Sequence, residues 1–293
     1  SSSRMSLSFL RLLCCPFCEG ELTPERGSEI VDEPEFGVLS CNCDRYPVVA
    51  GIPIFKKGPV GSIGGRPCEP WQVINLIEAG RHREALFAVL LPPPPANAPA
   101  GWQEESEALF SRTENQATVC DLVDFYFGQT GGWSEFTSIH YFLFRFGQSR
   151  QLMALSLANL IEKPQKPVLD LACGIGHITR SLIARAEGQP VLGLDRSFFV
   201  LYLAKNWVAP AGKYVCGDAD ASLPFRDGTF SAAFCTNTFH VLVNRATCMR
   251  ELKRVTQDDG AIVLVGLANN LVNKHPTTLP IEGYEALVAD MPH

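Results

Sequence analysis

The stretch at residues 168–179, Val-Leu-Asp-Leu-Ala-Cys-Gly-Ile-Gly-His-Ile-Thr, constrains the fold of this chain more than any other. An apolar run with one acid, Asp170, ends at Gly174 and Gly176, and a helix-like segment follows. A strand that stops at glycines and turns into a helix brings backbone N–H groups close to a ligand. The next apolar run ends at Asp195, about 20 residues beyond the loop, where folds of this kind hold a ribose. These features predict a nucleoside-binding site.

Strand-like and helix-like patterns alternate over residues 166–267. Such alternation predicts an α/β fold, with a parallel sheet covered by helices on both faces. The strand-like runs are Val168–Cys173, Val191–Asp195, Lys213–Cys216, Ala232–Thr236 and Ala261–Leu267. Helix-like stretches at 177–187, 197–206 and 245–255 lie between several of them.

The composition limits the partners that this chain can have. Hydrophobic residues make up 46% of the 293 residues, which is enough for a substantial core. Charged residues make up 19% and the net charge is −6, which argues against nucleic acid bound through a broad basic face. No apolar run reaches the length of a membrane span, and Ser1–Ser8 lacks the features of a signal peptide. The Ser-Ser-Ser-Arg before Met5 resembles the remnant of an expression tag.

Eleven cysteines raise the question of a secreted, disulfide-bonded protein. Cys173, Cys216 and Cys235 lie in or beside apolar strand-like runs, where free cysteine is common as a small hydrophobic residue. Several cysteines nearer the N-terminus have metal-ligand spacing instead. The sequence therefore predicts a reducing, cytoplasmic location.

Four cysteines near the N-terminus have the spacing of a zinc site. Cys15-Pro-Phe-Cys18 is a tight knuckle whose thiolates can hold one metal ion, and Cys41-Asn-Cys43 can supply two more ligands. Four thiolates around zinc form a closed structural site with no open position for catalysis. Cys14 can replace Cys15, and the alternative to a metal site is a set of free or disulfide-bonded cysteines.

The residues after the second pair, Tyr46-Pro-Val-Val-Ala-Gly-Ile-Pro-Ile-Phe55, resemble the Tyr-Pro-x-x-x-Gly-Ile-Pro signature of Trm112-like zinc-ribbon domains. Such ribbons occur alone as methyltransferase activators, and they also occur fused ahead of methyltransferase domains. The resemblance covers residues 10–56 and implies a structural Zn²⁺. The Cys-x-Cys spacing at Cys41 departs from the usual pattern of these ribbons.

Residues 166–267 resemble class I S-adenosylmethionine-dependent methyltransferases in five motifs that follow one another in order. The fold that this resemblance implies is a Rossmann-like sheet with helices on both faces, preceded here by the small zinc ribbon and a helical cap. The five matches are Asp170-Leu-Ala-Cys-Gly-Ile-Gly176, Leu194-Asp195-Arg196, Gly217-Asp218-Ala219 with Leu223-Pro224-Phe225, Cys235-Thr-Asn-Thr-Phe-His240, and Arg250-Glu-Leu-Lys-Arg-Val255 with Asp259-Gly260. Phe230-Ser231 departs from the usual Phe-Asp of the family.

The resemblance implies S-adenosylmethionine as the cofactor and gives its binding residues a role each. Asp195 accepts from both ribose hydroxyls, Asp218 accepts from the adenine amino group while the Ala219 N–H donates to the ring, and Asp170 lies near the ammonium group. The alternative for each aspartate is a helix cap or a turn residue. The full cofactor-binding set is Asp170, Ala172, Cys173, Gly174, Gly176, Asp195, Arg196, Asp218, Ala219 and Asn237.

The competing nucleoside is NAD. Its fingerprint adds a third glycine three residues after the second, and this chain has Thr179 at that position. The sequence therefore favours S-adenosylmethionine over a nicotinamide cofactor.

The sequence offers candidates for catalysis and for the acceptor pocket. His240 follows the fourth strand and is the candidate general base, which is needed only if the acceptor keeps a proton at attack. An aromatic segment just before the core contains His140, Tyr141 and Arg145, which are candidate pocket residues. The alternatives are a structural histidine and a helix that packs its aromatic side chains into the core.

The predicted organisation has three parts. Residues 9–57 form the zinc-ribbon module, residues 68–163 a helical linker and substrate cap, and residues 164–293 the methyltransferase core. Within the cap, residues 71–91 are expected to form one amphipathic helix. The last two strands usual in this core are not evident in residues 268–293, so its C-terminal part is predicted to be incomplete.

Three functions remain open at this point. The first is methyl transfer to a small organic acceptor, for which specialised metabolism is one setting. The second is methylation of an rRNA or tRNA base, because bacterial ribosomal-RNA guanine methyltransferases also join an N-terminal zinc module to this core. The third is a non-catalytic, cofactor-binding interaction protein whose ribbon docks a partner. The sequence leaves the oligomeric state open.

Overall fold

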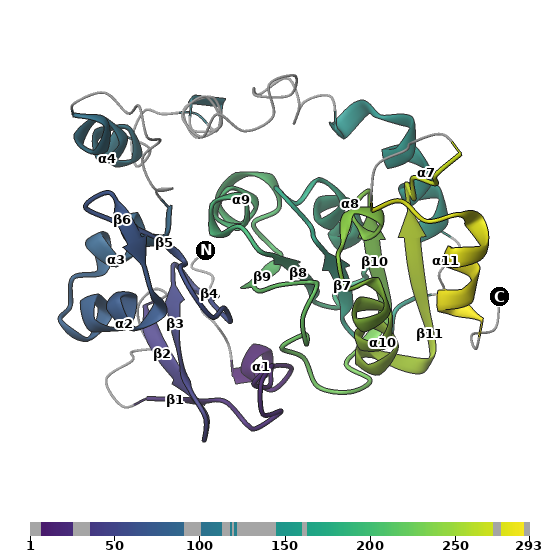
Figure 1. Ribbon diagram of the computed structural model, residues 1–293, viewed down its shortest axis with the longest axis horizontal. Coiled ribbons are helices and arrows are strands. Elements are labelled where there is room, and N and C mark those ends of the chain that lie inside the picture. The colour runs from purple at the N-terminus through teal and green to yellow at the C-terminus, as the bar shows by residue number, and fades with distance from the viewer. Residues whose placement is uncertain are drawn as a thin grey trace.

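The computed structural model describes residues 7–25, 36–90, 101–112, 118, 120–121, 145–159, 163–271 and 277–289 (Figure 1). A small N-terminal module lies beside a larger α/β core. The predicted aromatic segment before the core falls mostly outside the described residues.

The core is built on a five-stranded parallel sheet, as the sequence predicts. Its strands are β7 (Val168–Leu171), β8 (Val191–Asp195), β9 (Lys213–Cys216), β10 (Phe230–Thr236) and β11 (Thr256–Val265). The order across the sheet is β11-β10-β7-β8-β9, and all neighbouring pairs are parallel. The chain moves outward from β7 to β9 and then crosses to β10 on the other side of β7. This crossing creates a switch point, where open α/β sheets bind their ligands.

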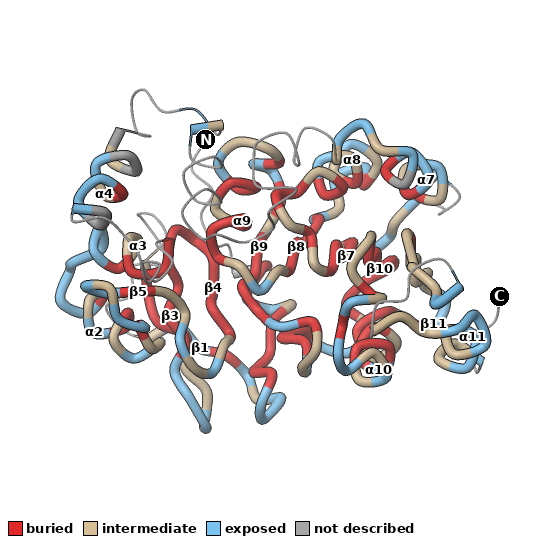
Figure 2. The backbone as a smooth tube through the Cα atoms, turned by 45° about the horizontal axis from the view of Figure 1, so that its top comes forward, coloured by how far each residue is buried: buried red, intermediate tan, exposed pale blue. Residues whose placement is uncertain are grey.

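Helices cover both faces of this sheet. On one face, Leu169 and Leu171 of β7 share a cluster of buried side chains with Leu252 of α10 (Arg245–Val255). On the other face, a second cluster joins the strands to α8 (His177–Arg185) and α7 (Ser149–Ala158). Because both faces are covered there, the strands β7 to β10 are apolar nearly throughout and buried, whereas the edge strand β11 is largely half-buried or exposed (Figure 2). The predicted Rossmann-like arrangement is confirmed.

The N-terminal module has its own antiparallel sheet. Its strands are β1 (Thr23–Pro24), β2 (Gly37–Ser40), β3 (Arg45–Val49) and β4 (Ile52–Pro53), in that order. The short helix α1 (Leu7–Leu10) precedes them, and a hairpin of β5 (Gly61–Ile63) and β6 (Arg66–Cys68) follows.

The module and the core share one hydrophobic interior. The Phe55 N–H donates to the Cys216 carbonyl at 2.8 Å, which places the end of the module's sheet beside β9 (Figure 1). The Cys14 N–H donates to the Pro224 carbonyl at 3.1 Å. Tyr46 and Phe55 belong to the same buried cluster as the β7 leucines. We therefore expect the two parts to unfold together.

A buried lysine links the two parts. Lys205, in the π-helical turn Ala204–Val208 that follows α9 (Phe198–Leu203), is 8% exposed and donates to the Ala50 carbonyl at 2.6 Å. Lys205→Met keeps most of the side-chain volume and leaves that carbonyl without this donor. We expect the free energy of unfolding to fall by about 1–3 kcal/mol. Chemical denaturation measures the change.

Lys163→Met is the matched control for this substitution. Lys163 forms an exposed ion pair with Glu187 at 3.0 Å, and such pairs contribute little to stability. Equal losses in the two variants would contradict a specific role for Lys205.

The prediction of one helix over residues 71–91 is wrong. The structure has two helices, α2 (Pro70–Glu78) and α3 (His82–Leu90), and Gly80 with φ 70° lies between them. The Gly80 N–H donates to the Ile77 carbonyl and the Arg81 N–H to the Leu76 carbonyl. This pair of bonds, with glycine in the left-handed region, is the usual way to terminate a helix.

In the described part of the chain no strand follows β11. There, α11 (Ile281–Val288) packs on α10, and Asn269 and Leu279 form an isolated bridge. Farther upstream, α4 spans Trp102–Arg112. None of the helices in the described ranges combines the length and the apolar character needed to span a bilayer.

Candidate functional site

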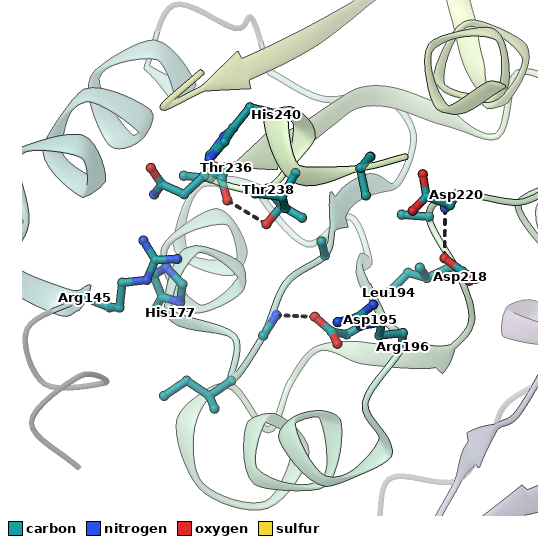
Figure 3. Close-up of a pocket in the computed structure, with 17 residues that line it drawn as sticks. Arg145, His177, Leu194, Asp195, Arg196, Asp218, Asp220, Thr236, Thr238 and His240 are labelled. Carbon is teal, nitrogen blue, oxygen red and sulfur yellow. Dashed lines mark hydrogen bonds between the residues drawn. The ribbon is translucent and has the colours of Figure 1, made fainter. Parts of the chain in front are cut away.

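A cavity of about 570 Å³ opens at the carboxyl ends of β7, β8 and β10, at the switch point of the sheet (Figure 3). Its size lies within the range of small-molecule sites. The residues that line it are Arg145, Ala172, Gly174, Ile175, His177, Leu194, Asp195, Arg196, Asp218, Ala219, Asp220, Thr236, Asn237, Thr238, His240, Val241 and Leu242. Seven of the ten predicted cofactor residues and His240 are among them.

The glycine loop after β7 is held by its own hydrogen bonds. The Gly174 N–H donates to the Asp195 carboxylate at 3.0 Å, and the Gly176 N–H donates to the Cys173 carbonyl at 3.0 Å. These two amides are thus already paired, contrary to the expectation that the loop offers them to a ligand. Gly174 has φ 53°, and a Cβ there would meet nothing within 4 Å, so its open side faces space that a ligand can fill.

Gly176 is required for packing. Its φ is 82°, and a Cβ at this position would lie 3.1 Å from the Cβ of Ala204. Gly176 caps the N-terminus of α8, and that helix could not approach the turn after α9 as closely with a larger residue.

Asp195, the last residue of β8, connects the glycine loop to the start of α9. Its Oδ2 accepts from the Gly174 N–H and its Oδ1 accepts from the Ser197 N–H at 2.9 Å. Burial raises the pKa of this carboxyl, while the two amide hydrogen bonds and the nearby Arg196 lower it. Each carboxylate oxygen has two lone pairs, so each can accept one more hydrogen bond from a ligand in the cavity.

One wall of the cavity is acidic. After β9, one oxygen of Asp218 accepts from the Asp220 N–H at 2.9 Å, which is the turn role considered for it in the sequence. Asp220 accepts from the Asn244 N–H at 2.7 Å and so fixes the start of α10. Ala219 completes this wall. Asp195, Asp218 and Asp220 lie toward the same end of the cavity in Figure 3.

The end of β10 contributes polar atoms that have no hydrogen-bond partner among the described residues. Thr236 Oγ1 and Asn237 Oδ1 are both buried and lack a hydrogen-bond partner among these residues. Asn237 lies in the left-handed region, with φ 59°. A Cβ at position 266 would lie only 2.0 Å from Asn237 Oδ1, so position 266 requires a glycine. Buried polar atoms in native proteins are nearly always paired, so these two point to a ligand in the cavity.

His240 lies on the short 3₁₀ helix Phe239–Val241 and lines the cavity next to Thr236 and Thr238 (Figure 3). Its backbone carbonyl accepts from Arg245 at 3.1 Å, which holds this turn against α10. His240 therefore lies where a ligand in the cavity can reach it. Its role as a general base stays a prediction.

Three predicted cofactor residues do not line the cavity: Asp170, Cys173 and Gly176. Asp170 is buried beneath the loop, where its carboxylate accepts from the Thr179 hydroxyl at 2.6 Å. Burial raises the pKa of Asp170 to about 7. Thr179, which stands where a dinucleotide fingerprint has a glycine, therefore holds Asp170 in place.

Two of the predicted acceptor residues, His140 and Tyr141, lie outside the described residues. Arg145, from the same predicted segment, lines the cavity, whereas none of the residues of α2 or α3 does. Sequence reasoning missed His177 and Asp220, although each is the first polar residue after a predicted motif. It also missed Thr236 and Thr238, which flank the predicted Asn237.

A second site lies in the N-terminal module, where the four predicted cysteines meet. The sulfur atoms of Cys15, Cys18, Cys41 and Cys43 all lie within 4.8 Å of one another. The Cys15–Cys43 distance is 3.5 Å, Cys18–Cys41 is 3.7 Å and Cys41–Cys43 is 3.4 Å. These distances are too long for disulfides and close to the ~3.8 Å edge of a zinc–thiolate tetrahedron with 2.3 Å bonds.

The surroundings of the cluster also fit a metal bound by thiolates. The Tyr46 hydroxyl lies 3.0 Å from Cys15 Sγ, and the backbone N–H groups of Phe17 and Cys43 each donate to a cysteine sulfur at 3.4 Å. Such donors orient the ligands and stabilise thiolate charge. Cys14 is buried outside the cluster, so the geometry favours Cys15 over Cys14.

Comparison with known proteins identifies the domain that contains the cavity. Residues 169–264 match the family model described as a methyltransferase domain. The chain is similar to a demethylmenaquinone methyltransferase of Thermotoga maritima, with 31% identity over 122 residues that cover 42% of this chain and 52% of the relative. It is also similar to a malonyl-[acyl-carrier protein] O-methyltransferase of Pseudescherichia vulneris, with 33% identity over 120 residues that cover 41% of this chain and 46% of the relative.

The chain spans about half the length of these curated relatives. Among solved structures, a SAM-dependent methyltransferase from Aquifex aeolicus aligns with a TM-score of 0.42 and 20% identity, covering 50% of this chain and 80% of that one. The family match covers β7 through nearly all of β11 and includes every predicted cofactor residue. Residues 169–264 therefore match a methyltransferase domain, within a core that has the Rossmann-like fold.

Proposed function

We propose that this protein transfers a methyl group from S-adenosylmethionine to a small organic acceptor. The observation that carries the proposal is Asp195, which joins the glycine loop and lines a cavity at the switch point of a matched methyltransferase domain. When bound, the cofactor supplies a methyl group on a positively charged sulfur, which an electron-rich acceptor atom can attack.

The residues of the cavity bind and orient the two reactants. Asp195 accepts from the ribose hydroxyls, and Asp218 with Ala219 holds the adenine. The open side of Gly174 lets the chain of the cofactor pass close to the backbone. Asn237 Oδ1 and Thr236 Oγ1 provide further acceptors on the opposite wall. Much of the rate enhancement in such transfers comes from positioning of the two reactants and from exclusion of water.

An organic acceptor with an apolar part fits the rim of the cavity. Val241, which lines the cavity, is 47% exposed, and Phe146 packs edge-to-face against His177, which also lines it. The names of the relatives, which refer to demethylmenaquinone and to a malonyl group on acyl-carrier protein, also support a small organic acceptor over an RNA base.

The proposed role of His240 gives a specific prediction. His240→Ala should lower turnover by about 10²–10⁴-fold if the histidine takes a proton from the acceptor. Cofactor affinity should change much less, because the adenine and ribose contacts lie at the other end of the cavity. Steady-state rates and calorimetric affinities measure the two effects. An unchanged rate would show that His240 is not the general base.

The cysteine cluster is proposed to hold a structural Zn²⁺. Four protein ligands leave no open position on the metal, so its contribution is to folding. The metal would hold together a module with few strands, whose last strand ends at the β9 edge of the methyltransferase sheet.

Turnover assays with several acceptor classes test the proposal. S-adenosylhomocysteine should form with a reduced naphthoquinone or with a malonyl thioester, and mass spectrometry should find one added methyl group. Formation of the product only with tRNA or rRNA would favour the nucleic-acid interpretation. Cofactor binding without turnover in any acceptor class would favour a non-catalytic interaction protein.

A further inference from the structure

We propose that Cys18 and Cys41 form an oxidation site, at which a hydroperoxide converts two ligands of the cysteine cluster into a disulfide and so releases the metal. Both residues are ligands of the proposed structural Zn²⁺, so the inference rests on that part of the proposed function. The four sulfur atoms are unevenly covered, and this difference decides which of them an oxidant reaches.

One side of the cluster is protected. Cys15 is 0% exposed and packs in the same buried cluster as Tyr46 and the β7 leucines. Its sulfur lies 3.0 Å from the Tyr46 hydroxyl and accepts from the Phe17 N–H at 3.4 Å. An oxidant in the solvent therefore has no direct path to the sulfur of Cys15.

The opposite side of the cluster is open to solvent. Cys18 is exposed, and a Cβ at position 20 would lie only 3.1 Å from Cys18 Sγ. Gly20 therefore leaves free the space beside this sulfur that a larger residue would fill. Metal ligands are thiolates, and oxidation of cysteine follows thiolate character and exposure. Cys18 is thus the sulfur that a hydroperoxide should reach.

Cys41 is the partner that can complete a disulfide. It is half-buried in the loop between β2 and β3, and its sulfur lies 3.7 Å from that of Cys18. Cys43 is exposed as well and lies 3.4 Å from Cys41, but only Asn42 separates these two cysteines. Loops this short are stiff and close with difficulty, so the disulfide is assigned to Cys18 and Cys41.

The reaction proceeds in two steps. The Cys18 thiolate attacks one oxygen of hydrogen peroxide, the O–O bond breaks, and hydroxide leaves, which makes Cys18 a sulfenic acid. The Cys41 thiolate then attacks the Cys18 sulfur, the S–O bond breaks, and a second hydroxide leaves. The two thiolates together lose two electrons to the peroxide, and the two hydroxides take protons from the solvent to become water.

The disulfide is incompatible with the metal site. The two sulfur atoms must approach from 3.7 Å to about 2.05 Å, and neither remains a thiolate. Only Cys15 and Cys43 would then be left to bind the metal, which a closed zinc site with four ligands does not tolerate. Oxidation should therefore release the Zn²⁺.

Loss of the metal should be felt at the cofactor cavity. The N–H of Cys14, the residue next to the ligand Cys15, donates to the Pro224 carbonyl at 3.1 Å. Pro224 belongs to the segment that follows Asp218 and Ala219, which line the cavity. We therefore expect the oxidised protein to bind S-adenosylhomocysteine about tenfold more weakly or worse.

The test treats the full, zinc-loaded chain with hydrogen peroxide. A colorimetric chelator should detect one zinc released per chain, and peptide mapping by mass spectrometry should find a disulfide between Cys18 and Cys41. Dithiothreitol with added zinc should restore the affinity for S-adenosylhomocysteine. This reversal separates the disulfide from oxidation of Met153, which is 56% exposed, because methionine sulfoxide is reduced by dedicated reductases.

Cys14→Ser is the matched control, because Cys14 is 4% exposed and lies outside the cluster. This variant should release zinc at the same rate and form the same disulfide as the unsubstituted protein.

The proposal is overturned if zinc stays bound in excess peroxide, if the disulfide joins any other pair of cysteines, or if Cys14→Ser prevents the release. Unchanged affinity for S-adenosylhomocysteine after release would overturn the link to the cofactor cavity. Failure of the proposed function looks different, because the untreated protein would then hold no zinc or bind no S-adenosylhomocysteine.

Discussion

The Asp195→Ala variant is expected to lose affinity for S-adenosylhomocysteine by about a hundredfold or more. In the proposed binding mode this carboxylate accepts a hydrogen bond from each of two ribose hydroxyls, and each such bond would contribute about 1.5–3 kcal/mol. In the unsubstituted protein this carboxylate also accepts hydrogen bonds from the N–H groups of Gly174 and Ser197. The substitution leaves both N–H groups without this acceptor. The glycine loop would keep the bond from the Cys173 N–H to the Leu194 carbonyl of β8 but lose the bond from Gly174, which adds to the loss of affinity.

A control distinguishes loss of binding from loss of folding. Asp258 is an exposed residue of β11 outside the cavity, so Asp258→Ala should bind the ligand as the unsubstituted protein does. Circular dichroism and thermal unfolding should show both variants folded. Unchanged affinity in a folded Asp195→Ala protein would mean that the ribose role is assigned to the wrong residue.

Loss of the metal is the second large effect that we expect. Structural zinc provides about 10–16 kcal/mol of apparent binding free energy in zinc-finger peptides, and here the module shares its interior with the core. Cys15→Ser should therefore lower the free energy of unfolding of the whole chain by several kcal/mol. The unfolding transition should remain single, because Tyr46 and Phe55 pack in the same cluster as the β7 leucines.

The neighbouring cysteine provides the control. Cys14 is buried outside the cluster, so Cys14→Ser should keep one zinc per chain and cost about 1 kcal/mol. Elemental analysis should find one zinc in the unsubstituted protein and much less in Cys15→Ser. Equal zinc content in the two variants would contradict the assignment of Cys15.

The effect of the metal should reach the cofactor cavity. Lys56, just after the module's last strand, donates to the carbonyl of Arg196 at 3.2 Å, and Phe55 pairs with Cys216. Both contacts lie in the segments that carry Asp195 and Asp218. Removing zinc with a chelator should therefore weaken cofactor binding as well as stability.

The sheet could be predicted from the sequence because its signals are local and strong. All five predicted strands and the helices at 177–187 and 245–255 occur in the structure, since buried parallel strands read as short apolar runs between turns. The strand predicted from Ala261 begins earlier, at Thr256, where the pairing with β10 shifts register at Phe230 and Ala232. A bulge of this kind leaves little trace in one sequence.

The break between α2 and α3 was less predictable. Val73 and Ile77 before it, and Ala85 and Val89 after it, are each four residues apart, so a helical spacing of buried apolar residues occurs on both sides of Gly80. A glycine inside a helical pattern is often tolerated, and only the left-handed conformation at this position ends the helix. The docking of these helices on the N-terminal module depends on contacts that no local pattern contains.

Part of the cavity lining could also be predicted from the sequence, because it depends on where the parallel strands end. Residues that end a parallel strand meet at one edge of the sheet, which brings Gly174, Asp195, Asp218 and Asn237 together. The pairing of the Gly174 amide with Asp195 was not predictable, because it depends on how two loops approach each other. His177 was missed because its sequence position reads as an ordinary first residue of a helix.

Titration of the metal-loaded chain with S-adenosylhomocysteine tests the central claim most directly. We expect one molecule to bind per chain, the Asp195→Ala variant to lose this binding, and NADH to give no measurable heat. Binding of NADH in place of S-adenosylhomocysteine, or no binding of S-adenosylhomocysteine by the folded protein, would contradict it.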